Sequence, residues 1–293
     1  MRIDSSQPTT TRQIIQQATS SLKKAGCDSP RLDAELLLMQ VWHMQRTDLI
    51  MRSTEPVPEA VQQAFEILIQ RRRQREPLAY ILGEKEFWSR PFHVCPDVLI
   101  PRPETEHLIE AVLDHFPDQQ GKLYFCDIGT GSGCIAVTLA CEYPNARIIA
   151  TDISHAALNI AKKNAILHQV EQRIAFRQGD MLAALQADDA RCDAIISNPP
   201  YVSQDEMATL EPELSHEPHQ ALTDGADGLR HLKSILHDAE TYLNTDGLII
   251  LETGPCGLPP TPASLSFEHS IEDLAGHARG GIYQRANRLN QDG

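Results

Sequence analysis

Four residues near the middle of the chain, Asn198-Pro199-Pro200-Tyr201, suit chemistry on a planar amide or amino group. They follow the apolar run at residues 194–196, which predicts a buried strand. The nitrogen of such a group is a poor nucleophile because its lone pair is delocalised. A site can help by accepting a hydrogen bond from each N–H, here with the side-chain oxygen of Asn198 and the backbone carbonyl of Pro199.

The prolines and the tyrosine fit the same interpretation. The fixed φ of proline limits the freedom of the Pro199 carbonyl, and Pro200 would contact the substrate beside it. Tyr201 supplies a flat face on which a planar target could stack. Catalysis would then come from orientation and preorganised electrostatics, without a strong general base. Taken alone, the motif is equally compatible with a turn after a strand. The exocyclic amino group of adenine in nucleic acid and the side-chain amide of glutamine in protein are planar targets of this kind.

A glycine-rich loop lies upstream, where Gly129-Thr130-Gly131-Ser132-Gly133 joins a predicted strand to a predicted helix. Its glycines let the backbone turn sharply and let a ligand approach it closely. The spacing is G-x-G-x-G, which differs from the dinucleotide-binding G-x-G-x-x-G, and the loop lacks the lysine of a P-loop. A purely structural turn would also explain this loop on its own.

Acidic residues end the next two predicted strands. Asp152 stands 19 residues after Gly133, where an acid can accept both hydroxyls of a ribose. A role before Ser154 as a helix N-cap is compatible with that position. Asp180 and Met181 end the following strand. Because the carboxyl ends of parallel strands share one edge of a sheet, we expect these residues and the glycine loop to surround a nucleoside-shaped site.

Strands and helices must position these residues, and the sequence alternates between strand and helix patterns. This alternation predicts an α/β fold with a mostly parallel sheet covered on both faces. The predicted strands cover residues 123–128, 146–153, 173–180, 192–198 and 247–253, and the predicted helices cover 134–143, 155–169 and 229–243.

The N-terminal quarter of the chain has a different pattern. Residues 11–75 read as helices, one of them starting at Pro30 with Leu32, Leu36 and Met39 on its apolar face. Alternation around Ser89-Arg90-Pro91 predicts a β-hairpin, and Pro103 begins another helix. We therefore predict a helical domain at 1–84, a hairpin linker at 85–102 and an α/β domain at 103–293.

Composition excludes several classes of protein. The formal net charge of −14 opposes phosphate backbones, which argues against a nucleic-acid binder. The one basic stretch, Arg71–Arg75, reads equally well as a solvated helix face or a partner-docking surface. None of the seven cysteines forms a C-x-x-C pair and the histidines show no ligand spacing, so we expect no metal site and no disulfide framework. No apolar run approaches the roughly 20 residues of a membrane helix and no signal-peptide core is present, so we expect a cytoplasmic protein.

Taken together, the glycine loop, Asp152 and Asp180 resemble a class I S-adenosylmethionine-dependent methyltransferase domain. The resemblance implies that the loop passes under the methionine moiety, that Asp152 holds the ribose, and that Asp180 and Met181 flank the adenine. It also implies that Asn198 contacts both cofactor and substrate.

A more specific resemblance extends over about residues 10–254. The segments RLDAELLL, EPLAYILGEKEFW, VLIPRPETE and HEPHQALTDGADGL, with the glycine loop and the NPPY motif, resemble the peptide chain release factor glutamine methyltransferase family, also called PrmC or HemK. The family methylates the side-chain N5 of the glutamine in the GGQ motif of class 1 release factors. The resemblance implies a Rossmann-like methyltransferase domain preceded by a helical substrate-recognition domain and a hairpin, acting as a monomer.

Alternatives differ in substrate or activity. A related enzyme methylates a glutamine of ribosomal protein L3, but the PRPETE segment at 101–106 favours the release-factor enzyme. The acidic charge disfavours an adenine methyltransferase of nucleic acid, and the intact NPPY motif disfavours a binding-only regulator. Arg102 could pair with a carboxylate of cofactor or substrate, or simply precede a helix start.

Residues 255–267 depart from the family pattern. The family usually has a helix here, whereas this chain places Pro259, Pro260 and Pro262 in the segment. A proline in a helix interior costs about 3 kcal/mol, so we expect this surface helix to be missing. A family-like ending with a final strand pair returns at 268–286, and the crevice residues are unaffected.

Overall fold

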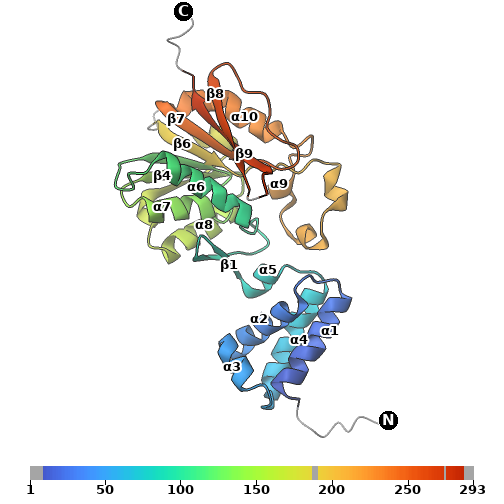
Figure 1. Ribbon diagram of the computed structural model, residues 1–293. Helices are drawn as coiled ribbons and strands as arrows, with labels where there is room; N and C mark the ends of the chain where they lie inside the picture. The colour runs from blue at the N-terminus through green and yellow to red at the C-terminus, as the bar shows by residue number, and fades with distance from the viewer. Residues whose placement is uncertain (1–8, 187–190, 274, 287–293) are drawn as a thin grey trace, which may run out of the picture. The chain divides into compact units, whose positions relative to one another are not determined.

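The computed structural model describes residues 9–186, 191–273 and 275–286, which form two compact units (Figure 1). The first unit ends at Gly83 and also includes Pro212–His216. The second consists of Glu84–Glu211 and the residues from Glu217 onward, so it contains the hairpin. The functional division at 84 and 102 expected from the sequence stays a prediction.

The first unit is entirely helical, as predicted. α1 begins with a capping box in which the Thr10 side chain accepts from the Gln13 backbone N–H and the Gln13 side chain accepts from the Thr10 N–H. Apolar residues from α1, α2 and α4 form its core. The helices are α1 Thr11–Lys24, α2 Pro30–Trp42, α3 Arg46–Met51, α4 Glu59–Arg73 and α5 Leu78–Leu82.

The predicted apolar face of α2 is only partly correct, because Met39 packs against the core whereas Leu32 does not. Leu32 is 44% exposed, whereas Ala34, Leu37 and Leu38 are fully buried. The run from 36 to 39 is almost continuously apolar, so periodicity does not define a unique face there. The buried face also contains Asp33, which a hydrophobic pattern could not assign to it.

A buried arginine explains why the Asp33 carboxylate can be buried. Arg72 Nε lies 2.7 Å from Asp33 Oδ2, and Arg72 Nη1 lies 3.0 Å from Glu213 Oε1. Arg75 also pairs with Glu213 and donates to the Gly26 carbonyl at 2.7 Å. Neither reading of the basic stretch, solvated face or docking surface, describes Arg72, because its charge is neutralised inside the helical unit.

We expect Arg72→Met to destabilise the helical unit by about 3–5 kcal/mol, because it leaves Asp33 buried without its cation. Arg73→Met is the matched control, since Arg73 is exposed and donates only to Gln70 among the described residues. Urea unfolding followed by Trp42 fluorescence in a Trp88→Phe background reports on this unit. Equal stability of the two variants would contradict the argument.

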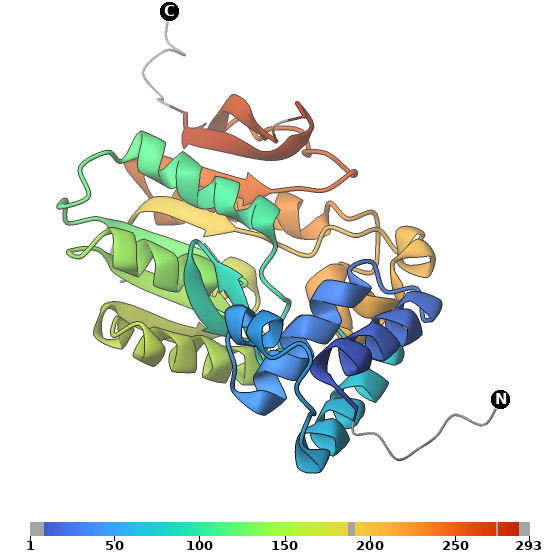
Figure 2. The same cartoon turned by 60° about the horizontal axis from the view of Figure 1, so that its bottom comes forward.

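The second unit is built on one seven-stranded sheet, in the order β5-β4-β3-β6-β7-β9-β8 (Figure 2). The first five strands of that order run parallel, β9 is antiparallel to β7, and β8 is antiparallel to β9. The strands are β3 Tyr124–Ile128, β4 Arg147–Asp152, β5 Ile174–Gln178, β6 Cys192–Ser197, β7 Leu243–Glu252, β8 Leu265–Glu272 and β9 Ala278–Arg285.

Helices cover both faces of this sheet, which confirms the mostly parallel α/β prediction. Successive strand residues point to opposite faces, so Phe125 packs with α6, α7 and α8, while Cys126 packs in the other core with α10. The helices are α6 Glu106–His115, α7 Cys134–Glu142, α8 His155–Leu167, the short α9 His219–Leu222 and α10 Arg230–Asp238.

The predicted hairpin is confirmed as β1 Glu84–Phe87 paired with β2 Arg90–His93. Trp88 and Ser89 occupy its turn with φ of 51° and 56°, the left-handed values that a twisted two-residue turn requires. The turn thus falls one residue before the predicted centre. Phe87 and Phe92 are buried in the same core as α6 and α7, which fixes the hairpin to the second unit.

The segment that departs from the family pattern contains no helix. Between Thr253 and Ser264 the chain forms turns and irregular backbone, and β8 begins directly afterwards at Leu265. The final strand pair is therefore retained, as expected. No helix in the described part of the chain is long and apolar enough to cross a membrane.

Candidate functional site

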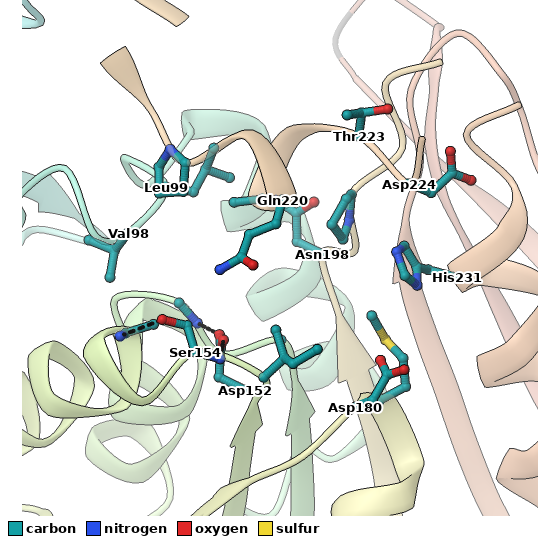
Figure 3. A pocket seen from close by; sticks show the side chains of 18 of the residues that line it. Val98, Leu99, Asp152, Ser154, Asp180, Asn198, Gln220, Thr223, Asp224 and His231 are labelled. Carbon is teal, nitrogen blue, oxygen red and sulfur yellow. Dashed lines mark hydrogen bonds between the residues drawn. The ribbon is translucent and has the colours of Figure 1, made fainter. Parts of the chain in front are cut away.

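A pocket opens at the carboxyl ends of the parallel strands β3, β4 and β6 (Figure 3). This is the edge at which open α/β sheets bind their ligands. Segments from across the second unit form its wall: residues 97–99, Gly129, Gly131, 152–154, Ala157, 179–181, Asn198, Pro200, Pro218, Gln220, Ala221, Thr223, Asp224 and His231.

The three glycines of the loop after β3 have two different roles. All have positive φ, of 71°, 53° and 82° in chain order, which glycine adopts without strain. Gly129 and Gly131 line the pocket and expose backbone to a ligand. Gly133 instead packs against α8, because a Cβ there would lie 3.0 Å from Cβ of Ala161.

Thr130 and Ser132 are buried behind the pocket wall. Thr130 Oγ1 donates to Asp127 Oδ2 at 2.6 Å, and the Ser132 carbonyl accepts from Asn164 at 2.8 Å. Burial raises the pKa of Asp127 to about 7, although the hydrogen bonds from Thr130 and the Ala136 N–H act in the opposite direction. The two residues shape the loop in this structure, and their contact with a cofactor stays a prediction.

Asp152 lies at the end of β4 and faces the pocket. Its Oδ2 accepts from the Gly131 N–H at 2.9 Å, and its Oδ1 accepts from the Ser154 N–H at 2.8 Å. Burial raises the pKa of Asp152, while these two backbone bonds lower it. Each carboxylate oxygen can accept a second hydrogen bond, so both remain available to a diol. The cap of α8 is Ser154, whose hydroxyl accepts from Ala157, so Asp152 is not the N-cap considered above.

Apolar and acidic side chains gather beside Asp152. Asp180 and Met181 line the pocket, as does Ile153, whose side chain is 55% exposed. Burial lowers the pKa of His231, while the carboxylates of Asp224 and Asp180 raise it. The structure therefore brings the two predicted adenine-end residues together with an exposed apolar side chain on which a flat base could rest.

Asn198 is oriented by a buried hydroxyl. Its Nδ2 donates to Thr105 Oγ1 at 3.0 Å, and Thr105 is only 2% exposed. With the amide nitrogen used in this way, Oδ1 is the atom left to accept a hydrogen bond from a ligand. In Figure 3, Asn198 and Gln220 lie across the pocket from Asp152.

The other members of the NPPY motif lie at different depths. Pro200 lines the pocket, whereas Pro199 is buried, and no hydrogen bond from the described residues reaches its carbonyl. Tyr201 is not in the pocket wall, and its hydroxyl donates to Glu252 Oε1 at 3.1 Å. Burial and the Glu252 charge raise the pKa of Tyr201, so it stays protonated. Stacking of Tyr201 on the target stays a prediction.

Gly254 offers a test of how tightly Tyr201 is held. A methyl group there would lie 2.6 Å from Cδ2 and 2.7 Å from Cε2 of the tyrosine ring. We expect Gly254→Ala to displace the ring and lower kcat by about 10–100-fold. Calorimetric titration of S-adenosylmethionine should show unchanged affinity, because the glycine lies outside the pocket wall. A parallel loss of affinity would contradict this assignment.

Arg102 pairs within the chain. Its Nη2 lies 2.5 Å from Oε1 of the buried Glu217, whose Oε2 accepts from the Ile100 N–H at 3.1 Å. These bonds hold the segment that continues to Gln220 in the pocket wall. Arg102 itself is not in the wall, and its contact with a ligand carboxylate stays a prediction.

Several pocket residues were not predicted from the sequence. Val98, Leu99 and Gln220 come from irregular segments, and only the quoted segments VLIPRPETE and HEPHQALTDGADGL pointed to their neighbourhood. His231 lies in the helix predicted at 229–243, but nothing assigned it to the site. Glu252, at the end of β7, was also missed. In the described part of the chain, no group of three or more histidine, cysteine or acidic residues is placed to hold a metal ion.

Two family models match the chain, one in its helical part and one in its α/β part. The PrmC N-terminal domain model matches residues 13–83, and the methyltransferase small domain model matches residues 106–229. The release factor glutamine methyltransferase of Nitratidesulfovibrio vulgaris is 41% identical over 285 residues, covering 94% of this chain and 95% of that protein. The protein of the same name from Coxiella burnetii is 43% identical, covering 83% of this chain and 84% of its own length.

One structural relative shares the fold alone. The hMettl16 catalytic domain, crystallised with MAT2A 3'UTR hairpin 1, is 17% identical with a TM-score of 0.51, covering 65% of this chain and 72% of that one. The second unit therefore has the class I methyltransferase fold, and the chain is a methyltransferase.

Proposed function

Because the chain belongs to the release factor glutamine methyltransferase family, we propose that it methylates the glutamine of the GGQ motif in class 1 peptide chain release factors. The methyl group would come from S-adenosylmethionine and go to the side-chain nitrogen N5. The observation that carries this proposal is the Asn198 amide, whose nitrogen is committed to Thr105 and whose oxygen is left for a substrate N–H.

The pocket fits S-adenosylmethionine in charge and shape. Asp152 keeps acceptor capacity for the ribose hydroxyls, Ile153 and Met181 offer apolar contact to adenine, and the glycine loop leaves room for the methionine end. Four aspartates line the pocket, which suits a positively charged ligand: Asp97, Asp152, Asp180 and Asp224. When bound, S-adenosylmethionine supplies a methyl group activated by a sulfonium.

The chain's own contribution is to orient the acceptor nitrogen. Asn198 Oδ1 and the Pro199 carbonyl would each accept one N–H of the glutamine amide. This holds the amide plane and directs the developing lone pair of the nitrogen toward the pocket that Asp152 lines. Preorganised acceptors of this kind act without reorganising during the reaction, which is why a general base is not required.

The remaining parts of the proposal concern the setting of the enzyme. We propose that it acts in the cytoplasm as a monomer, without a metal ion and without binding nucleic acid directly. The acidic pocket supports the last point, because four aspartates around the reaction site would repel a phosphate backbone.

Transfer of tritiated methyl groups from S-adenosylmethionine tests the proposal. Purified release factor, ribosomal protein L3 and DNA are offered separately to the enzyme. We expect label on the release factor only. Label on L3 would keep the amide chemistry but overturn the assignment of partner. Label on DNA would overturn the amide assignment, and no label with intact cofactor binding would indicate a binding-only role.

A further inference from the structure

Two hydrogen bonds between partly or fully buried polar groups lie between the Asn198 amide and the end of β7. Asn198 Nδ2 donates to Thr105 Oγ1, and Tyr201 Oη donates to Glu252 Oε1. We propose that Glu252 is a positioning residue that acts through Thr105 to fix which end of the Asn198 amide faces the substrate. This inference rests on the proposed function, in which that amide receives an N–H of the glutamine.

The numbers of donors and acceptors indicate that the Asn198–Thr105 bond and the Tyr201–Glu252 bond are joined through a bond from Thr105 to Glu252. Thr105 already accepts from Asn198, so its one hydroxyl hydrogen has to be donated elsewhere. Glu252 Oε2 is buried and has no hydrogen-bond partner among the described residues. The Thr105 hydroxyl also lowers the pKa of the Glu252 carboxyl, which indicates that the hydroxyl lies near this carboxyl. A hydrogen bond from Thr105 to Glu252 would use both the free hydroxyl hydrogen and the free carboxylate oxygen.

The Glu252 carboxylate determines which group donates and which accepts in each of these hydrogen bonds. An ionised carboxylate accepts and never donates, so both hydroxyls, Thr105 and Tyr201, must point their hydrogens toward Glu252. Thr105 can then only accept from Asn198, and Oδ1 is turned to the pocket. A glutamine at position 252 removes this constraint, because its amide can donate to Thr105. Thr105 would then donate to Asn198 Oδ1, which turns Nδ2 toward the substrate N–H and sets two donors against each other.

The ionisation of Glu252 falls in the neutral range. Burial raises its pKa to about 7, while the hydroxyls of Thr105 and Tyr201 lower it. Of the charged neighbours, Glu104 raises this pKa and Arg102 lowers it. The acceptor-only form is therefore fully present above neutral pH and is lost as the pH falls through the pKa.

Steady-state kinetics of two isosteric variants test the direction of these hydrogen bonds. We expect Glu252→Gln and Thr105→Val each to lower kcat for the methyl acceptor by about 10–100-fold, with unchanged affinity for S-adenosylmethionine. The double variant should be no worse than either single one, because both break the same series of hydrogen bonds. Thr105→Ser, which keeps the hydroxyl, should restore most of kcat.

A matched control separates positioning from packing. Thr138 is a fully buried threonine of α7 whose hydroxyl has no partner among the described residues, so Thr138→Val should keep kcat. Near-wild-type kcat in Glu252→Gln would overturn the proposal. So would a loss of kcat that only follows the loss of folded protein in thermal melts.

A second measurement, an NMR titration, does not depend on the identity of the methyl acceptor. The side-chain ¹⁵N–¹H₂ resonances of Asn198, assigned by their disappearance in Asn198→Asp, should shift with an apparent pKa near that of Glu252. In Glu252→Gln the shift should vanish. If wild-type enzyme labels no release factor yet shows this titration, the proposed function fails and the positioning role stands. If the resonances do not titrate in wild type, the positioning role fails whatever the acceptor.

Discussion

Replacing Asn198 with alanine is expected to lower kcat for methyl transfer by about 10²–10³-fold, the typical effect of removing one preorganised hydrogen-bonding group. The substrate amide would lose the acceptor that Thr105 holds in place at 3.0 Å. S-adenosylmethionine should still bind, because the acceptors assigned to its ribose lie across the pocket on Asp152. Single-turnover transfer and calorimetric titration measure the two effects separately.

Asn145→Ala is the matched control for this substitution. Asn145 is exposed, and its Nδ2 donates to the Gln120 carbonyl at 2.9 Å. It lies just before β4 begins, at the end of that strand opposite to the pocket. It should turn over like wild type. Near-wild-type turnover in Asn198→Ala would instead show that the amide clamp does not contribute to catalysis.

Replacing Asp152 with alanine is expected to weaken the binding of S-adenosylmethionine by about 10²-fold or more. Two hydrogen bonds to a charged carboxylate contribute about 1.5–3 kcal/mol each, and about 1.4 kcal/mol corresponds to a factor of ten. The substitution also removes the partner of the Gly131 and Ser154 N–H groups, so the glycine loop loses its anchor. Equilibrium titration of the cofactor measures the change.

Asp193→Ala is the control for a lost strand-end carboxylate. Asp193 accepts from the Tyr124 N–H at 2.8 Å and from Asn244 at 2.6 Å, at the start of β6 rather than at the carboxyl edge. Its loss should leave cofactor affinity unchanged. If both variants bind the cofactor equally well, Asp152 does not hold the ribose.

The local part of the site was predictable from the sequence because its signals are short in range. A glycine at positive φ, an acid at a strand end and an NPPY run each follow one strand, and parallel strands bring such residues to one edge. Gly129, Gly131, Asp152, Asp180 and Asn198 accordingly meet in one pocket.

Long-range partners could not be predicted in the same way. The hydrogen bond from Asn198 to Thr105 spans 93 residues, and that from Tyr201 to Glu252 spans 51. Nothing in the sequence around Glu252 distinguishes a positioning acid from an ordinary strand end. The same limit applies to Asp33, whose burial depends on Arg72, 39 residues away.

The segment at 255–267, which departs from the family pattern, shows that prolines determine local structure. Three prolines between 259 and 262 predicted the absence of a helix, and the structure has none from Thr253 to Ser264. The family resemblance at 268–286 predicted the final strand pair, but the place of this pair at the sheet edge depends on the contact of β9 with β7. Leu248–Glu252 aligns with Gly280–Gln284 of β9 and sets the register of the sheet edge.

Tandem mass spectrometry of release factor incubated with the enzyme and S-adenosylmethionine tests the central claim most directly. The account predicts a single added methyl group on the peptide that contains the GGQ motif, with fragment ions placing it on the glutamine side chain. The same peptide should stay unmodified when Asn198→Ala enzyme is used. A methyl group on any other residue, or equal modification by the variant, would contradict the account.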